Sequence, residues 1–295
     1  MRKERIKVNS FLSVFCNGGK MFLTFGEQIA YWMKNPHLLY RKPFHVIENI
    51  YYVGNDWVSS YLLDTKEGLI LIGATMSQTA DMLVDSIKSS GFDPKNIRKL
   101  LITHAHYDQC GGAKAIHDLS GCEIWLGRHD EFFFTQRRYM IMFEKTVPDF
   151  PITNFYNYDS VIDCGDIQIR PLHCPGHTPG TTSFFFDIQH KGRTLVCGHH
   201  GGIGSSFLAR DVMARSGIPL SLRDNYLISI EKVRNIHVDV VLPQYPGKFK
   251  GFDFWKAAES DDGSGDNLID SQAWGKMLDS KQKAILEIML KEEGF

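Results

Sequence analysis

Two histidines and an aspartate lie close together in the segment Thr-His-Ala-His-Tyr-Asp-Gln-Cys-Gly-Gly, residues 103–112. His104 and His106 are two positions apart, and Asp108 follows two positions later. Zinc binds imidazole nitrogen and carboxylate oxygen readily, and a catalytic zinc site uses three protein ligands and leaves one position open. Two histidines at this spacing, just past a strand, can turn toward one ion if the backbone bends. The segment therefore predicts a metal site.

A third imidazole has to come from a distant part of the chain. His177 stands in the segment Pro-Gly-His-Thr-Pro-Gly, directly after an apolar run, and His199 and His200 also follow an apolar run. In open α/β sheets, ligands collect beyond the ends of strands, so histidine-rich loops at several strand ends indicate one shared site. We expect His104, His106 and His177 to supply the three protein ligands of one zinc ion.

The hydrophobic pattern predicts the elements that must position these side chains. Short apolar runs bounded by turn residues predict strands, and amphipathic segments predict helices. Polar turns at 66–68 and 164–166 predict two β-hairpins. The expected strands cover 49–54, 59–65, 68–73, 97–103, 122–127, 181–188, 193–198 and 238–243, and the expected helices cover 82–92, 111–119, 225–236 and 274–293. Two sets of strands with helices between them favour a layered α/β architecture.

The segment from Arg128 to Pro151 is less regular and is rich in aromatic residues and methionine. An apolar stripe at helical spacing usually belongs to the core. The alternative is a lid or a wall over a pocket. The residues alone leave both interpretations open.

The composition is that of an ordinary globular protein of 295 residues, with 43% hydrophobic residues and a net charge of −1. This balance gives no electrostatic case for a nucleic acid or an anionic membrane as partner. Six cysteines occur without a C-x-x-C pair, which indicates reduced thiols in a cytosolic protein. The basic N-terminus is followed by an apolar run of only five residues, FLSVF, whereas a secretory signal needs roughly 7–15. We therefore expect a cytoplasmic protein, and export is the less favoured alternative.

The segment from Phe44 to Leu290 resembles the metallo-β-lactamase superfamily and, more narrowly, its subclass B3. The resemblance rests on H-x-H-x-D at 104–108, the two glycines behind it, and the phrase PGHTPGTTSFFF at 175–186. It implies an αββα sandwich of the α/β (α+β) class, with two mixed sheets face to face and helices outside. It also implies a single domain over 41–295, after an N-terminal extension over 1–40.

The resemblance assigns the ligands residue by residue. His104, His106 and His177 match the ligands of a first zinc ion, and Asp108 matches a ligand of a second. Gln109 stands where the subclass usually has histidine. A glutamine carbonyl is a neutral oxygen donor that binds zinc less well than imidazole, although glutamine does occur here in some relatives. We therefore expect one zinc to bind firmly and the second site to be weakened or altered.

Three further positions depart from the pattern of the family. Tyr245 stands where a final histidine usually precedes proline, and it is interpreted either as a second-site ligand or as a pocket wall. His199 falls near a strand-end position where relatives carry Ser, Cys or a bridging Asp, and it is a candidate metal ligand. Gly73 replaces an aspartate that commonly supports the site.

The reaction that the resemblance implies is hydrolysis of a carbonyl substrate by a zinc-bound hydroxide, and a β-lactam is the first expectation. Asp108 would orient the hydroxide, His199 would protonate the leaving group, and Tyr245 is a third candidate catalytic residue. One alternative is a cytoplasmic hydrolase of a lactone, a thioester or another cyclic amide. Another is a metal-containing protein that binds a metabolite without catalysis. A small molecule is the expected partner, and the oligomeric state stays open.

Overall fold

The first of two large sheets is mixed and has seven strands in the order β3-β4-β5-β6-β7-β8-β9. The structure is a computed structural model that describes residues 13–16, 19–22, 25–141, 143–248 and 252–294. Strands β3 to β6 pair antiparallel, and β6 to β9 pair parallel. The bounds are β3 Phe44–Ile47, β4 Ile50–Tyr52, β5 Tyr61–Thr65, β6 Gly68–Ile72, β7 Ile97–Leu101, β8 Glu123–Leu126 and β9 Asn154–Phe155. The hairpin predicted at 66–68 joins β5 to β6.

The second large sheet has five strands in the order β10-β11-β12-β13-β14. Strands β10 to β13 pair antiparallel, and β14 pairs parallel to β13. The bounds are β10 Ile162–Asp163, β11 Gln168–His173, β12 Thr182–His190, β13 Arg193–His199 and β14 Val240–Val241. The hairpin predicted at 164–166 joins β10 to β11. A separate two-stranded sheet pairs β1, Ser13–Cys16, with β2, Gly19–Phe22.

Residues along the central strands alternate between two hydrophobic clusters, because successive side chains point to opposite faces of a sheet. Ile70 and Ile72 of β6 belong to the cluster that also holds Phe184 and Phe186 of β12. Their neighbour Leu71 and the intervening Phe185 belong to the other cluster, which lies against the helices. Both faces of these strands are therefore buried, which explains why their sequences read as continuous apolar runs.

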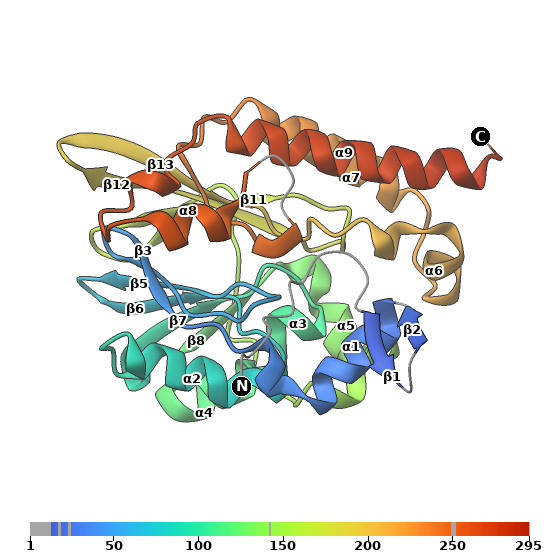
Figure 1. Ribbon diagram of the computed structural model, residues 1–295, viewed down its shortest axis with the longest axis horizontal. Helices are drawn as coiled ribbons and strands as arrows, with labels where there is room; N and C mark the ends of the chain where they lie inside the picture. The colour runs from blue at the N-terminus through green and yellow to red at the C-terminus, as the bar shows by residue number, and fades with distance from the viewer. Residues whose placement is uncertain (1–12, 17–18, 23–24, 142, 249–251, 295) are drawn as a thin grey trace.

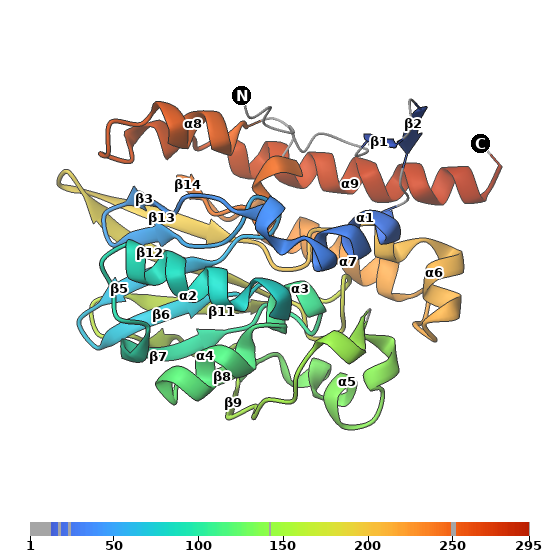
Figure 2. The same ribbon diagram turned by 60° about the horizontal axis from the view of Figure 1, so that its bottom comes forward.

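Helices α2, α4, α7 and α9 lie on the outer faces of the two sheets (Figures 1 and 2), whereas Phe254 of α8 belongs to the hydrophobic cluster between the sheets. Helices α2 and α4 cover the first sheet, and α7 and α9 cover the second. This arrangement confirms the predicted αββα sandwich of two mixed sheets flanked by helices. The helix bounds are α1 Phe25–Lys34, α2 Ala80–Ser89, α3 Tyr107–Cys110, α4 Ala113–Ser120, α5 Glu131–Thr135, α6 Arg210–Arg215, α7 Leu222–Arg234, α8 Phe254–Ser260 and α9 Ala273–Glu292.

Two segments outside the predicted pattern pack onto the body. In α1, which lies within the expected extension 1–40, the Trp32 ring lies 5.0 Å from the Trp57 ring, measured between centroids. The division of the chain at residue 40 stays a prediction. The segment 128–151 forms α5 and several short 3-10 turns rather than one long helix. Phe133 of this segment is buried in the core, whereas Phe143 contacts Tyr107 at 5.1 Å between ring centroids.

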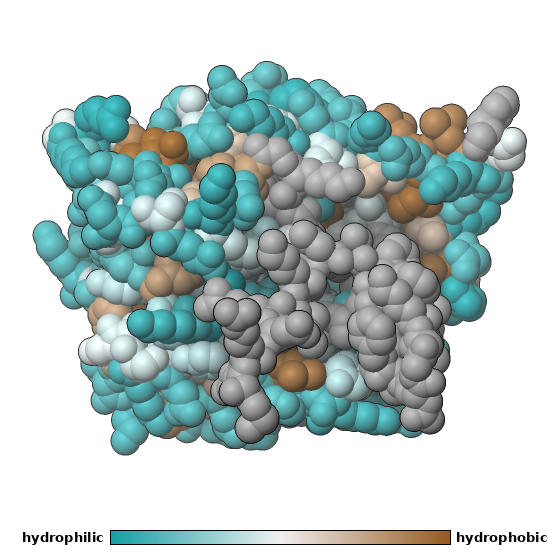
Figure 3. All heavy atoms as spheres, in the orientation of Figure 1, coloured by the Kyte–Doolittle hydropathy of each residue, from teal (hydrophilic) through white to brown (hydrophobic). Residues whose placement is uncertain are grey.

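The part of the surface drawn in colour in Figure 3 is mostly hydrophilic, and its apolar areas are small and separate. Within the described residues, no helix is long and apolar enough to cross a membrane. Five cysteines are buried and form no disulfide: Cys110, Cys122, Cys164, Cys174 and Cys197.

Candidate metal centre

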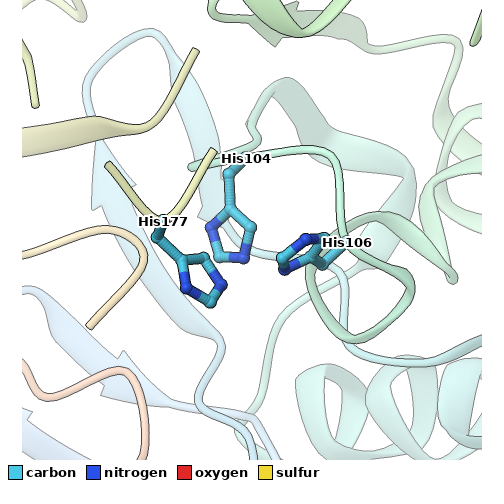
Figure 4. A group of neighbouring side chains, drawn as sticks. All are labelled: His104, His106 and His177. Atoms are coloured by element: carbon cyan, nitrogen blue, oxygen red, sulfur yellow. The ribbon is translucent and has the colours of Figure 1, made fainter. Parts of the chain in front are cut away.

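His104, His106 and His177 point toward one another (Figure 4). One possible ligand atom from each residue lies within 4.8 Å of the other two. The three Nε2 atoms are buried and have no hydrogen-bond partner. A buried polar atom without a partner costs free energy, so three of them aimed at one point fit a bound cation. No other group of His, Cys, Asp or Glu among the described residues meets this spacing.

In two of these imidazoles the other ring nitrogen, Nδ1, lies within hydrogen-bond distance of a neighbouring oxygen. His177 Nδ1 lies 2.7 Å from the Gly204 carbonyl oxygen, and His104 Nδ1 lies 3.0 Å from the Thr103 hydroxyl. A carbonyl oxygen only accepts, so Nδ1 of His177 carries the proton and Nε2 presents its lone pair. This is the arrangement that orients histidine ligands in metal sites.

Burial keeps the three imidazoles neutral. It lowers the pKa of His177 to about 4, and the Gly204 carbonyl opposes that change. Burial, reinforced by the neighbouring imidazole of His177, lowers the pKa of His104 and of His106 well below the ordinary value. Because a metal ion binds the neutral form of imidazole, the triad is ready for a cation at neutral pH.

The two ligand loops come from different sheets. His104 and His106 follow β7 and immediately precede α3, and His177 lies between β11 and β12. Gly111 and Gly112 allow the chain to leave this site, although their backbone angles are ordinary, with φ of −60° and −85°. A Cβ atom on Gly112 would lie 2.3 Å from the Ala74 carbonyl oxygen. Glycine is therefore required by close approach of the backbone rather than by a tight turn.

Asp108 and Tyr245 form a pair beside the triad. The Tyr245 hydroxyl donates a hydrogen bond to Asp108 Oδ2 at 2.5 Å. Burial and the adjacent Asp108 carboxylate raise the pKa of Tyr245 well above its ordinary value, which favours the protonated phenol that donates this hydrogen bond. Asp108 does not belong to the close group of the three histidines.

Gln109 is buried, and its carboxamide oxygen lies beside Thr103 and Gly73. The Thr103 hydroxyl donates to Gln109 Oε1 at 3.3 Å, and a Cβ atom on Gly73 would lie 3.2 Å from the same oxygen. The Gln109 Nε2 atom is buried without a hydrogen-bond partner. The Gln109 oxygen, which was expected to bind a second metal ion, therefore accepts a hydrogen bond from Thr103. Gly73 has no side chain, so this oxygen fits beside it.

His199 and His200 are both buried, and they lie near enough to the triad to influence the pKa of His104 and of His177, respectively. His199 Nδ1 donates to the Leu242 carbonyl at 2.7 Å, and His200 Nδ1 donates to the Gly201 carbonyl at 2.6 Å. Both Nε2 atoms are buried without partners. Burial lowers the pKa of each imidazole to about 4, and the backbone carbonyls oppose that change. Neither residue belongs to the close group of the triad.

Aromatic side chains lie close to one another and to the triad. The rings of Trp57 and Tyr245 stack with centroids 6.2 Å apart and an interplanar angle of 26°. Phe207, which the sequence did not single out, lies 4.9 Å from the His106 ring, measured between centroids. Its signal was weak, because it is one aromatic residue in the irregular stretch that follows His200.

Asp130 also escaped prediction. It is completely buried, and burial raises the pKa of its carboxyl to about 6 against the opposing hydrogen bonds from Thr178, Ala105 and Gly180. A usable signal existed, since Asp130 follows a predicted strand at the same edge of the sheet as the histidines.

Curated proteins with related sequences are hydrolases. An N-acyl homoserine lactonase from a Bacillus species is 24% identical over 224 residues, which cover 65% of this chain and 80% of that protein. Hydroxyacylglutathione hydrolase GloC of Haemophilus influenzae is 30% identical over 126 residues, which cover 39% of this chain and 56% of that protein.

Similar solved structures include subclass B3 metallo-beta-lactamases. One from Bradyrhizobium japonicum is 24% identical, with a TM-score of 0.77, and the match covers 87% of this chain and 96% of that one. A Cronobacter sakazakii metallo-beta-lactamase with a HARLDQ motif is 20% identical, with a TM-score of 0.78, and the match covers 90% of this chain and 94% of that one. At these identities the likeness establishes the fold. The present chain reads HAHYDQ at 104–109 and shares the glutamine of that motif.

The family model of the metallo-beta-lactamase superfamily matches residues 54–245, a segment that contains the three converging histidines, Asp108 and Tyr245. Together with the sandwich fold and the buried triad, this match shows that the chain belongs to the metallo-beta-lactamase superfamily.

Proposed function

We propose that this protein is a zinc-dependent hydrolase that cleaves a carbonyl substrate, with a β-lactam as the first substrate class. The observation that carries the proposal is the convergence of three buried Nε2 atoms without partners beside a buried aspartate. The donor set of three neutral imidazoles fits zinc, which accepts such ligands and keeps a further position open. Zinc bound there would lower the pKa of a water molecule toward ~7 and polarise the substrate carbonyl.

In this proposal Asp108 is the general base that takes the proton from the attacking water and the general acid that delivers it to the leaving atom. It orients the attacking water and accepts the proton that the water loses. The water oxygen forms a bond to the carbonyl carbon, and the carbon–nitrogen or carbon–oxygen bond of the substrate breaks. The proton then passes from Asp108 to the leaving atom. Tyr245 holds the carboxylate in place through its hydrogen bond to Oδ2.

The tautomer of His199 argues against the role of proton donor that the sequence proposed for it. Its Nδ1–H is already donated to the Leu242 carbonyl, and its lowered pKa leaves Nε2 unprotonated at neutral pH. Such a ring accepts a hydrogen bond at Nε2 or binds a metal there. We therefore propose an acceptor or ligand role for His199 and assign proton delivery to Asp108.

A lactone is the second candidate substrate class. It is favoured by the sequence relatives, which include an N-acyl homoserine lactonase that is covered over 80% of its length. The β-lactam is favoured by the subclass B3 neighbours among solved structures. Both substrates present a cyclic carbonyl to the same attack, so the site chemistry is shared between them.

The test combines metal analysis with a substrate panel. Purified protein is stripped with a chelator, reloaded with zinc, and assayed on nitrocefin, an N-acyl homoserine lactone and a glutathione thioester. We expect zinc-dependent turnover of a cyclic substrate. Turnover that survives chelation would contradict the metal-dependent mechanism. Tight zinc binding without turnover of any of the three substrates would favour a binding protein.

A further inference from the structure

A buried carboxylate lies between the two loops that carry the three imidazoles. Asp130 ends the short 3-10 helix η4, Arg128–Asp130, which follows β8. Its Oδ2 accepts hydrogen bonds from the Ala105 N–H at 2.8 Å and from the Thr178 hydroxyl at 2.7 Å. Its Oδ1 accepts a hydrogen bond from the Gly180 N–H at 2.6 Å. One side chain therefore binds both loops.

Two of the groups that donate hydrogen bonds to Asp130 belong to residues directly beside the histidine ligands. Ala105 lies between His104 and His106, and Thr178 directly follows His177. A shift of either loop relative to the other would break at least one of these three hydrogen bonds. Another link between the same segments is a backbone hydrogen bond of 2.9 Å from Thr182 to the Thr103 carbonyl, on the strand side of the histidines.

The packing around Asp130 leaves little freedom. A Cβ atom on Gly180 would lie 2.6 Å from the Asp130 nitrogen, and a Cβ atom on Gly127 would lie 2.0 Å from the Gly180 carbonyl oxygen. Real Cβ atoms essentially never approach other atoms this closely, so both positions need glycine. The carboxylate has no solvent exposure, and a buried charge of this kind persists only when hydrogen-bond donors satisfy it.

We propose that Asp130 is a positioning residue that ties the 103–106 loop to the 177–181 loop, so that the three imidazoles converge before a metal ion binds. The benefit to metal affinity rests on the proposed metal-dependent function, whereas the link between the loops does not. Residues that support metal ligands from outside the coordination sphere typically change metal affinity by about 10–100-fold when they are replaced.

Three substitutions separate this role from general stability. Asp130→Asn places an amide NH2 group against a set of three donors, so at least one bond is replaced by donor–donor repulsion. Thr178→Val removes the hydroxyl and keeps the shape, and Thr178→Ser restores the hydroxyl. Asp239→Asn is the matched control, because Asp239 accepts from the Val196 N–H at 2.9 Å and touches neither ligand loop.

The first readout is hydrogen exchange in metal-free protein. We expect the Ala105 and Gly180 amides to exchange at least about tenfold faster in Asp130→Asn, since a hydrogen bond to a charged group contributes about 1.5–3 kcal/mol. Thr178→Val should accelerate exchange in the same loops, and Thr178→Ser and Asp239→Asn should match the parent. Unchanged exchange at both amides in Asp130→Asn would overturn the proposed link, whatever the metal does.

The second readout is metal binding, with zinc alone in competition against a chelator and with the visible spectrum of the cobalt-substituted protein. We expect the zinc Kd to rise about 10–100-fold in Asp130→Asn and, less strongly, in Thr178→Val. The cobalt bands should change in both variants and return in Thr178→Ser. A lower melting temperature with unchanged Kd and cobalt bands would overturn the positioning role. If the parent binds neither metal, the proposed function fails, and hydrogen exchange alone then decides whether Asp130 links the loops.

Discussion

The hydroxyl of Tyr245 donates a hydrogen bond of 2.5 Å to Asp108 Oδ2. This pair stands where the family pattern places two ligands of a second metal ion, an aspartate and a final histidine. Burial and the Asp108 carboxylate raise the pKa of the phenol well above its ordinary value, which favours its protonated form. This geometry fits the proposed role of Tyr245 as a support for the Asp108 carboxylate.

Replacing Tyr245 with phenylalanine should lower kcat/KM about ten- to a hundredfold, because a hydrogen bond to a charged group contributes about 1.5–3 kcal/mol. Zinc content, measured by elemental analysis, should not change. The control is Tyr52→Phe, which removes a buried hydroxyl that donates to the Asn55 carbonyl. A loss of zinc in Tyr245→Phe but not in the control would show that Tyr245 is a metal ligand.

Replacing His106 with alanine should abolish both tight zinc binding and hydrolysis. The change removes one of three ligands, and the two remaining imidazoles cannot hold the ion in its site. Zinc titration and turnover of the best panel substrate measure the two effects. His117→Ala is the control, because His117 lies outside the triad and its Nδ1 bonds to the Cys122 carbonyl. Undiminished turnover in His106→Ala would refute the assigned site.

Replacing Gln109 with histidine should raise the zinc stoichiometry toward two per chain. The new imidazole supplies a stronger zinc donor than a carboxamide, next to Asp108. Gln109→Leu is the control, because it removes the amide without adding a ligand. Elemental analysis that finds the same zinc content in Gln109→His as in the parent would indicate that a side chain at 109 faces Thr103, as Gln109 does here.

The metal-free protein should lose stability as the pH falls from about 6.5 to about 4. Burial lowers the pKa of His177, His199 and His200 to about 4 in the folded chain, from an ordinary value of 6.5. Within this window the unfolded chain binds protons that the folded chain does not, so the free energy of unfolding decreases with decreasing pH. Each imidazole contributes up to about 1.4 kcal/mol per pH unit.

Denaturant unfolding of the chelator-treated protein at several pH values measures this slope. His200→Asn should show a shallower dependence, since it removes one buried titrating group and its amide can still donate to the Gly201 carbonyl. His237→Gln is the control, because the His237 side chain is 67% exposed. Equal slopes for His200→Asn and the parent would show that His200 titrates normally in the folded chain.

Local patterns in the sequence were sufficient to predict most elements of the fold. The hairpins at 66–68 and 164–166 and the helix of α9 follow from turn residues and from hydrophobic periodicity, which act over a few neighbouring positions. For 128–151 the sequence left two interpretations open, core or pocket wall, because aromatic spacing alone does not distinguish them. Phe133 of this segment is a buried member of the core cluster against the helices, and Phe143 packs against the same cluster, where it contacts Tyr107.

From residue types at short spacing or at strand ends, the sequence by itself predicted a layered α/β architecture and the three histidines. The sandwich fold was implied by the resemblance to the superfamily. Only the tertiary structure decided how the polar side chains pair. Asp108 and Tyr245 are 137 positions apart, and Asp130 and Thr178 are 48 apart. Such pairs form where loops of the two packed sheets meet. Gln109 and Thr103, in contrast, are six positions apart in one segment, where the Thr103 hydroxyl donates to Gln109 Oε1 at 3.3 Å. Hydrogen-bond geometry is decided within a few tenths of an ångström, and no pattern along the chain carries that information.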